Sequence, residues 1–362
     1  MMSTRVLNLR DLNRAALDRQ MLLERQPISV TEALHRLLAV QSQLPRAPFV
    51  GLWARTANFA PSSLRAAIRE HHVVRATSMR RTLHVLLASD LLAFWTTLHP
   101  QTEVALPGGT LWTAADLEPT LELAREHFRE PATFESFRER IAGAGLDEVR
   151  LRAYAARLLL PLVQANSDAP YGFGAGGEFV LARTWLGTDV AAQPDVPAEL
   201  VRRYLAAWGP ATPADFAAWS GLKGVVRWFE SLGEDVITLR DDRKRTLYDL
   251  RDARRPDGAT PAPPRLLPDF DGIMLGWQDR TRMISAEDAR QIANRNLQIP
   301  GVVLLDGFVG GTWKLERKRR SATVAIRTFR SISSTERSGL EEEALGLVRT
   351  FEPDATLAVT FS

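Results

Sequence analysis

Two glutamines separated by one residue are the feature of this sequence best suited to chemistry. Gln41, Ser42 and Gln43 stand at the expected end of a helix, just before a break at Pro45 and Pro48. An amide both donates and accepts hydrogen bonds, so two amides facing one cavity can hold and orient a water molecule. Amides are poor bases, so the pair suits only a reaction whose leaving group is already activated. A solvated helix end is the alternative interpretation.

A second candidate site lies within Met79–His84. Arg80, Thr82 and His84 alternate along the chain, so on a strand they would lie on one face. A guanidinium, a hydroxyl and an imidazole on one face suit a phosphate group or a displaced nucleotide. The alternative is a structural strand whose polar face meets water.

Basic residues are concentrated near the C-terminal end of the chain. The formal net charge is only +3, yet residues 314–330 contain seven lysines and arginines against Glu316 alone. These basic residues are Lys314, Arg317, Lys318, Arg319, Arg320, Arg327 and Arg330. Such a local concentration of positive charge suits binding to a polyanion, and a solvated hairpin is the alternative.

Composition and motifs exclude several other kinds of site. Cysteine is absent, which excludes disulfide scaffolds, thiol nucleophiles and thiolate zinc sites. No metal-ligand motif occurs, Gly172–Gly177 is typical of a hairpin turn rather than a nucleotide loop, and Asp271 suits a cap or a structural ion pair. We therefore expect neither metal nor cofactor. No run approaches the ~18 apolar residues of a membrane span, so a cytoplasmic, nucleoid-associated protein is expected.

Hydrophobic spacing predicts the elements that would hold these residues. A helix capped by Ser29 or Thr31 is expected to reach Gln43. Further helices are expected at 115–130, 133–142, 146–160, 199–208, 214–220, 225–232 and 335–350. Strands are expected at 83–86, 236–239, 245–249, 302–305, 308–309, 312–315 and 323–328, with Asp306-Gly307 as a hairpin turn.

The order of these elements predicts the domain organisation. A chain of 362 residues usually forms several units. The order helix, turn, helix, hairpin recurs about three times, which is typical of tandem winged helix-turn-helix units. We therefore predict an α+β fold in which three winged-helix units precede a C-terminal mainly β domain with the basic hairpin. The predicted domains are 1–110, 111–192, 193–253 and, after a proline-rich linker at 254–264, 265–362.

The order of several motifs resembles the AlkZ-like DNA glycosylases, a winged-helix superfamily that includes azinomycin-resistance glycosylases. The motifs are Asn13-Arg14-Ala15, Gln41–Pro48, Gly51–Arg55, Met79–His84, Leu267–Asp271, Asp279-Arg280, Asp306-Gly307 and Gly311–Trp313. The resemblance spans nearly the whole chain and implies tandem winged helices that clamp DNA. In the family's catalytic motif, a glutamine and an aliphatic residue precede a second glutamine or an aspartate. Gln41 and Gln43 occupy the first and third positions of this motif. At the second position, this sequence has Ser42 instead of an aliphatic residue.

This resemblance implies a DNA glycosylase in which Gln41 and Gln43 are catalytic. An N7- or N3-alkylated purine already has a positive charge and leaves without an acid, so the enzyme only has to place water and stabilise the sugar cation. No lysine nucleophile is evident, so the reaction should be monofunctional. The resemblance also implies that crosslinks are engaged without deep base flipping, ordinary flipping being the alternative. The expected DNA contacts are Arg46, Arg80, Thr82, His84, Lys314, Arg317, Lys318, Arg319 and Arg320.

Two other functions fit the same sequence. A non-catalytic winged-helix protein, such as a transcription regulator, would explain the basic hairpin equally well and would bind DNA sequence-specifically. A protein that sequesters a genotoxic small molecule would release no base. For the glycosylase, the expected partner is duplex DNA with alkylated bases, bound by a monomer.

Overall fold

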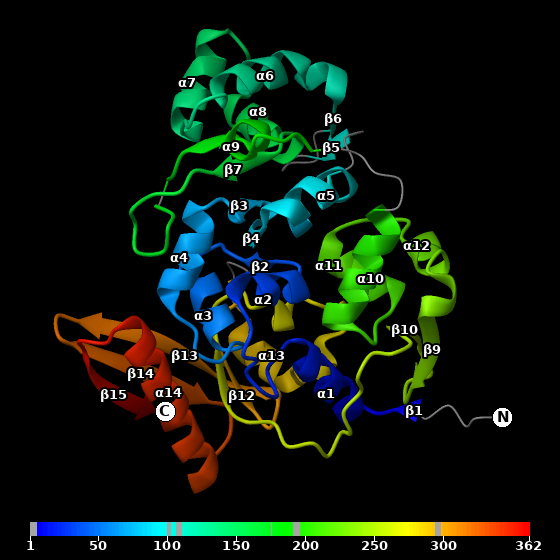
Figure 1. Ribbon diagram of the computed structural model, residues 1–362, viewed down its shortest axis with the longest axis vertical. Coiled ribbons are helices and arrows are strands. Elements are labelled where there is room, and N and C mark those ends of the chain that lie inside the picture. Colours follow the sequence, from blue (N-terminus) through cyan, green and yellow to red (C-terminus); the bar gives the residue numbers. More distant parts are fainter. Residues whose placement is uncertain (1–5, 100–102, 106–110, 175, 191–195, 294–297) are drawn as a thin grey trace. The chain divides into compact units, whose positions relative to one another are not determined.

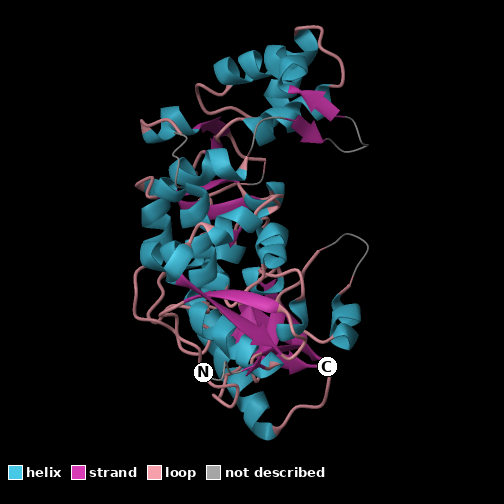
Figure 2. Ribbon diagram, turned by 90° about the vertical axis from the view of Figure 1, so that its right-hand side faces the viewer, coloured by secondary structure: helices cyan, strands magenta, loops and turns pink. Residues whose placement is uncertain are grey.

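The computed structural model describes residues 6–99, 103–105, 111–174, 176–190, 196–293 and 298–362. The chain divides into two compact units: unit 1 comprises residues 1–64 and 198–362, and unit 2 comprises residues 65–197. Figure 2 shows a mixture of helices and strands. Both units contain both kinds of element, so the α+β prediction is confirmed. The finer division into winged-helix domains stays a prediction.

The helices of unit 1 come from both ends of the chain (Figure 1). They are α1 (Leu9–Arg19), α2 (Val30–Leu37), α3 (Ala47–Trp53), α10 (Val196–Trp208), α11 (Pro213–Ser220), α12 (Val226–Glu230), α13 (Ala286–Ile292) and α14 (Ser334–Phe351). Several begin with the side-chain caps that their sequences predict. In α14, for example, Ser333 and Glu336 form a reciprocal capping box.

Two sheets complete unit 1. The smaller has the order β1-β9-β10, from β1 (Val6–Leu7), β9 (Val236–Asp241) and β10 (Thr246–Leu250). The larger follows sequence order and contains β11 (Arg265–Leu267), β12 (Val302–Leu305), β13 (Phe308–Lys318), β14 (Ser321–Thr328) and β15 (Thr356–Phe361). The strands expected at 308–309 and 312–315 are thus one long strand. It pairs antiparallel with β14, while β15 is parallel to β14.

Alternation of side chains gives the larger sheet one apolar face. Trp313, Val324 and Ile326 point to this face and are buried. α14 packs against this sheet, with Leu340 and Leu347 buried. The sheet and helix therefore form a two-layer core, from which the far end of the β13–β14 hairpin continues with exposed residues.

The described residues of unit 2 form two antiparallel sheets and a helical cluster. Within the unit, the strands of the larger sheet have the order β4-β3-β7-β8, from β3 (Val73–Thr77), β4 (Leu83–Leu87), β7 (Leu162–Gln164) and β8 (Phe179–Leu181). The other elements are α5 (Ala88–Leu98), β5 (Glu103–Ala105), β6 (Leu111–Thr113), α6 (Ala114–His127), α7 (Phe134–Gly143), α8 (Val149–Leu159) and α9 (Ala182–Leu186). α4 (Pro61–Arg69) crosses the boundary between the units. The glycine-rich segment expected to form a hairpin turn lies within the connection between the paired strands β7 and β8, and its Ala175 lies outside the described residues.

The proline-rich segment at 254–264 has no regular structure, but it is fastened to α1. The backbone N–H of Gly258 donates to Asp11 Oδ1 over 3.0 Å, and Arg14 Nε donates to the carbonyl oxygen of Thr260 over 2.6 Å. The segment therefore holds a fixed course along unit 1.

Candidate functional site

The helix expected to reach Gln43 ends earlier. α2 ends at Leu37 because Leu38 adopts a φ of 67°, which a right-handed helix does not allow. Gln41 then lies in the short strand β2 (Val40–Gln41), and Gln43 lies in the loop that follows. The prediction of a glutamine pair at a helix end is therefore wrong, although both amides still lie on one short segment before Pro45.

The two glutamines differ in exposure. Gln41 is 7% exposed, whereas the Gln43 side chain is exposed. Ser42, between them, is completely buried. The middle position of the motif therefore faces the interior, where an aliphatic side chain would also fit, and the segment passes from the interior of unit 1 to its surface.

α3 anchors this segment from the C-terminal side. All its residues are buried, and the backbone N–H of Ala47 donates to the carbonyl oxygen of Leu44 over 3.0 Å, closing a turn before the helix. A Cβ at Gly51 would lie 3.5 Å from Val40 Cγ1 and 3.6 Å from Pro268 Cγ. The helix, β2 and the segment after β11 therefore pack closely at one glycine.

A buried ion pair fastens α3 to the segment after β11. Arg55 donates two hydrogen bonds of 2.8 Å to the two carboxylate oxygens of Asp271, and both residues are almost fully buried. Arg55 also donates to the carbonyl oxygen of Gly51 over 2.9 Å, while Asp271 accepts from the backbone of Ile273 over 3.0 Å. Asp271 is thus a capping and ion-pair residue, as predicted. Its pairing with Arg55 was not predicted.

Arg46 connects the glutamine segment with the hairpin strand β13. Its guanidinium carbon lies 5.9 Å from the centroid of the Trp313 ring. Trp313 is itself fixed, since its Nε1 donates to the carbonyl oxygen of Leu267 over 2.7 Å. Unit 1 therefore brings Gln41, Gln43 and Arg46 together with a strand of the basic hairpin.

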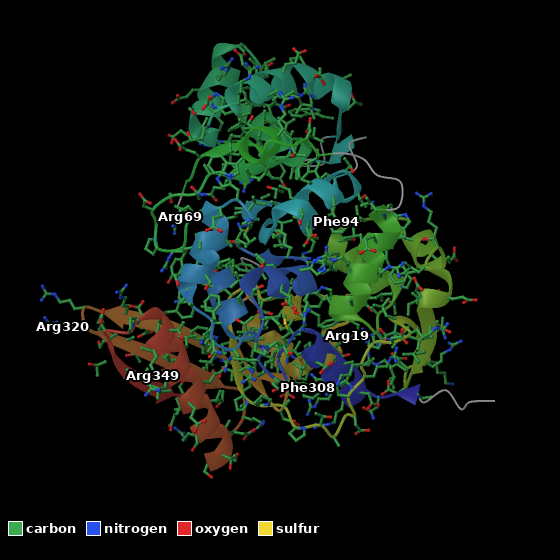
Figure 3. The ribbon with its side chains drawn as sticks, viewed as in Figure 1. Arg19, Arg69, Phe94, Phe308, Arg320 and Arg349 are labelled. Atoms are coloured by element: carbon green, nitrogen blue, oxygen red, sulfur yellow. The ribbon has the colours of Figure 1, made fainter. Side chains whose placement is uncertain are left out.

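The basic hairpin is present, and its five predicted DNA-binding residues are exposed. Lys314 pairs with Glu316, and Arg317 pairs with Glu352 over 2.9 Å. At the tip, Lys318, Arg319 and Arg320 form no ion pair with any residue that the structure describes, and Arg320 extends away from the ribbon (Figure 3). The concentrated positive charge at the tip is therefore not neutralised within the described parts of the chain.

The motifs Asn13-Arg14 and Asp306-Gly307 prove to be one structural contact. Asn13 Nδ2 donates to the carbonyl oxygens of Arg282 and Gly307, both over 2.8 Å, and Arg14 pairs with Asp306. Gly307 has a φ of 79°, and a Cβ there would lie 2.7 Å from Asn13 Oδ1, so only glycine fits. Partial burial raises the pKa of Asp306, but the paired arginines outweigh this and leave the pKa below its ordinary value.

Arg80, Thr82 and His84 do not share a strand face. Met79–Arg81 is a 3-10 turn in which Arg80 has a φ of 53°, and β4 begins only at Leu83. Arg80 and Thr82 therefore precede the strand, which contains His84 alone of the three, and the prediction of one face is wrong.

His84 is a core residue of unit 2. It is 2% exposed, and its Nδ1 donates to the carbonyl oxygen of Thr82 over 2.9 Å. Burial, aided by the nearby charge of Arg80, lowers the pKa of His84 to about 3, so the imidazole is neutral at neutral pH. Burial also lowers the pKa of Arg80, to about 10, which leaves its guanidinium cationic. Of the three residues, Arg80 has the charge that a phosphate contact needs.

Among the residues that the structure describes, no three histidine, aspartate or glutamate side chains gather in a way that could hold a metal ion. No helix in those same parts of the chain has the length and apolar character that crossing a membrane requires.

Comparison with known proteins identifies the class of enzyme. The sequence matches the family model of the AlkZ-like DNA glycosylases over residues 34–350. The chain therefore belongs to the AlkZ-like DNA glycosylase family, and the enzyme class implied by its motifs is confirmed.

Two comparisons with Streptomyces sahachiroi proteins agree with this assignment. The chain is 24% identical over 323 residues to an interstrand DNA cross-link repair glycosylase, covering 83% of this chain and 85% of that protein. It also matches the solved structure of the S. sahachiroi DNA glycosylase AlkZ with a TM-score of 0.79 at 20% identity, covering 99% of this chain and 100% of that one. The second likeness shows the fold, whereas the roles of individual residues stay predictions.

Proposed function

We propose that this chain is a monofunctional DNA glycosylase that excises positively charged N-alkylated purines, with water held by Gln41 and Gln43. The observation that supports this most directly is the geometry of the glutamine segment. It lies between α2 and the fully buried α3, with the exposed amide of Gln43 at the surface and Arg46 close by. A fixed backbone keeps amide groups in place before the substrate arrives, which favours catalysis by positioning.

The proposed step is hydrolysis of the N-glycosidic bond. The bond between the purine nitrogen and C1′ breaks, and its electron pair neutralises the cationic purine. The C1′ cation accepts the oxygen of the water that the two amides hold, and the water loses one proton to solvent. The products are a neutral alkylated purine and an abasic site, and no acid is needed because the leaving group is charged beforehand.

Interstrand crosslinks through such purines are the second proposed substrate. The chemistry at each crosslinked purine is the same, since alkylation has already placed the positive charge on the ring. The S. sahachiroi relative is an interstrand DNA cross-link repair glycosylase, which supports this extension. Releasing one of the two purines would unhook the crosslink.

Product analysis tests the proposed function. The protein is incubated with methylated duplex DNA, and the released base and the state of the strand are followed by mass spectrometry and denaturing electrophoresis. We expect free 7-methylguanine, strands that break only after alkali, and no complex trapped by borohydride. Unmodified DNA serves as the control. Sequence-specific binding without base release would instead identify a regulator.

The tip of the basic hairpin is proposed to bind DNA phosphates. Replacing Lys318, Arg319 and Arg320 together with glutamine should weaken binding and flatten its salt dependence. Each lost phosphate contact reduces the slope of log K against log salt by about 0.9. Fluorescence anisotropy at several salt concentrations measures this. Lys314→Gln is the control, because Glu316 already pairs with that lysine and a smaller change is expected. An unchanged slope in the triple variant would contradict the assignment.

A further inference from the structure

One exposed apolar side chain lies beside the exposed glutamine. Among the residues that the structure describes, three large hydrophobic side chains stand out as exposed: Val6 at 55%, Leu44 at 46% and Val226 at 52%. Val6 belongs to β1 and Val226 begins α12. Leu44 follows Gln43 directly, so of the three it alone adjoins the proposed reaction site. Single exposed apolar residues are common on proteins, so exposure alone does not suffice and the setting of Leu44 decides.

The backbone of Leu44 is held in place although its side chain is exposed. Its carbonyl oxygen accepts from Ala47 over 3.0 Å, and the next residue, Pro45, has a fixed φ. The carbonyl oxygen of Arg46 in turn accepts from Phe49 over 3.1 Å, within the buried α3. A rigid backbone that presents an apolar side chain to solvent loses little conformational freedom on binding a partner. These properties suit a side chain that is inserted rigidly into a partner, as a wedge, rather than the side chain of a flexible loop tip.

From this geometry we infer that Leu44 is a wedge that enters the base stack next to the alkylated purine. The inference rests on the proposed function and states how the site reaches its substrate. Leucine is one of the side chains that proteins insert between base steps to unstack and kink a duplex. Its insertion separates the damaged nucleotide from its neighbour and opens the sugar to the amide of Gln43. Full flipping of the base is not required, so a crosslinked purine can also be engaged.

Charge on the same segment agrees with this assignment. Arg46, two residues beyond Leu44, is partly exposed and can bind the phosphate that flanks the opened step. An exposed amide, an apolar wedge and a cation thus follow one another at positions 43, 44 and 46. The amide suits the sugar, the apolar side chain suits the base stack, and the cation suits the phosphate backbone of one nucleotide step.

Fluorescence of 2-aminopurine placed beside a 7-methylguanine in a duplex tests the wedge. Wild-type protein should raise the emission on binding, because the neighbouring base becomes unstacked. Leu44→Ala should lose most of that rise and slow single-turnover base release by about tenfold or more. Leu44→Met, which keeps an apolar side chain of similar length, should restore both. Val226→Ala is the matched control, an equally exposed apolar residue outside the segment, and should behave as wild type.

The outcomes separate the wedge from the proposed function. Wild-type emission and rate in Leu44→Ala would overturn the wedge while leaving the glycosylase intact, and so would the absence of any rise with wild-type protein. A rise in emission that depends on Leu44, without release of any base, would support the wedge and overturn the proposed function. Thermal melting of each variant checks that the exposed substitution leaves the fold unchanged.

Discussion

Gln43→Ala and Gln41→Ala are each expected to slow release of 7-methylguanine by about a hundredfold or more, because misplaced water and lost dipoles at the transition state have costs of that size. Affinity for the alkylated duplex should stay within about threefold, since neither amide supplies net charge. Single-turnover rates and anisotropy titrations measure the two quantities. Gln43→Ala is the cleaner variant, because its side chain is exposed while Gln41 is 7% exposed.

Two further variants control this prediction. Gln278→Ala removes another exposed glutamine of unit 1 and should leave the rate unchanged. Gln43→Asp should retain activity, because the family motif accepts aspartate at this place and a carboxylate can also hold water. Unaltered release in both alanine variants would remove the catalytic assignment from the glutamine pair.

The sequence predicted regular elements best where a spacing pattern ended at a strong local signal. Strand 302–305 was predicted with the bounds that β12 has, because Asp306-Gly307 follows it and both residues adopt positive φ, as a tight hairpin turn requires. The helix expected at 214–220 ends at Gly221, whose left-handed conformation closes α11. In both places a residue that tolerates unusual backbone angles marks the boundary.

Other boundaries had no such signal. Leu38 ends α2 with a positive φ, a conformation that leucine rarely adopts, so its side chain gave no reason to stop the helix there. Arg80 likewise adopts a positive φ just before β4 begins, and its residue type gave no indication of this. Tertiary packing imposes these backbone angles, and the spacing of residues in a single sequence gives no information about that packing. As a result the order of the candidate residues was predicted, but their orientation was not.

The contacts that hold the candidate site join distant parts of the chain. Arg55 and Asp271 are 216 residues apart, and Asn13 and Gly307 are 294 apart. Each of these residues belongs to one of the motifs on which the family resemblance rests, so the sequence indicated that the residues are important. Only the fold shows that they meet as pairs: Arg55 binds Asp271 beside α3, and Asn13 binds Gly307 where α1 meets the turn after β12.

Asp271→Ala is expected to lower the free energy of unfolding of unit 1 by about 3–5 kcal/mol, because it leaves the guanidinium of Arg55 buried without its counter-charge. Calorimetry, which can separate the transitions of the two units, measures the loss. Arg36→Ala is the control, since the Arg36–Glu32 pair is exposed and should contribute less than about 1 kcal/mol.

The double variant Arg55→Leu with Asp271→Leu shows whether this ion pair acts through its charge. Removing both charges leaves no unpaired ion, so the double variant should be more stable than Asp271→Ala, with Ile273 N–H losing its acceptor in both. Base release should still fall, because Arg55 also holds the carbonyl of Gly51 where α3 meets β2. A loss below about 1 kcal/mol in Asp271→Ala would mean that packing alone holds α3, and that the pair is not needed to fix the glutamine segment.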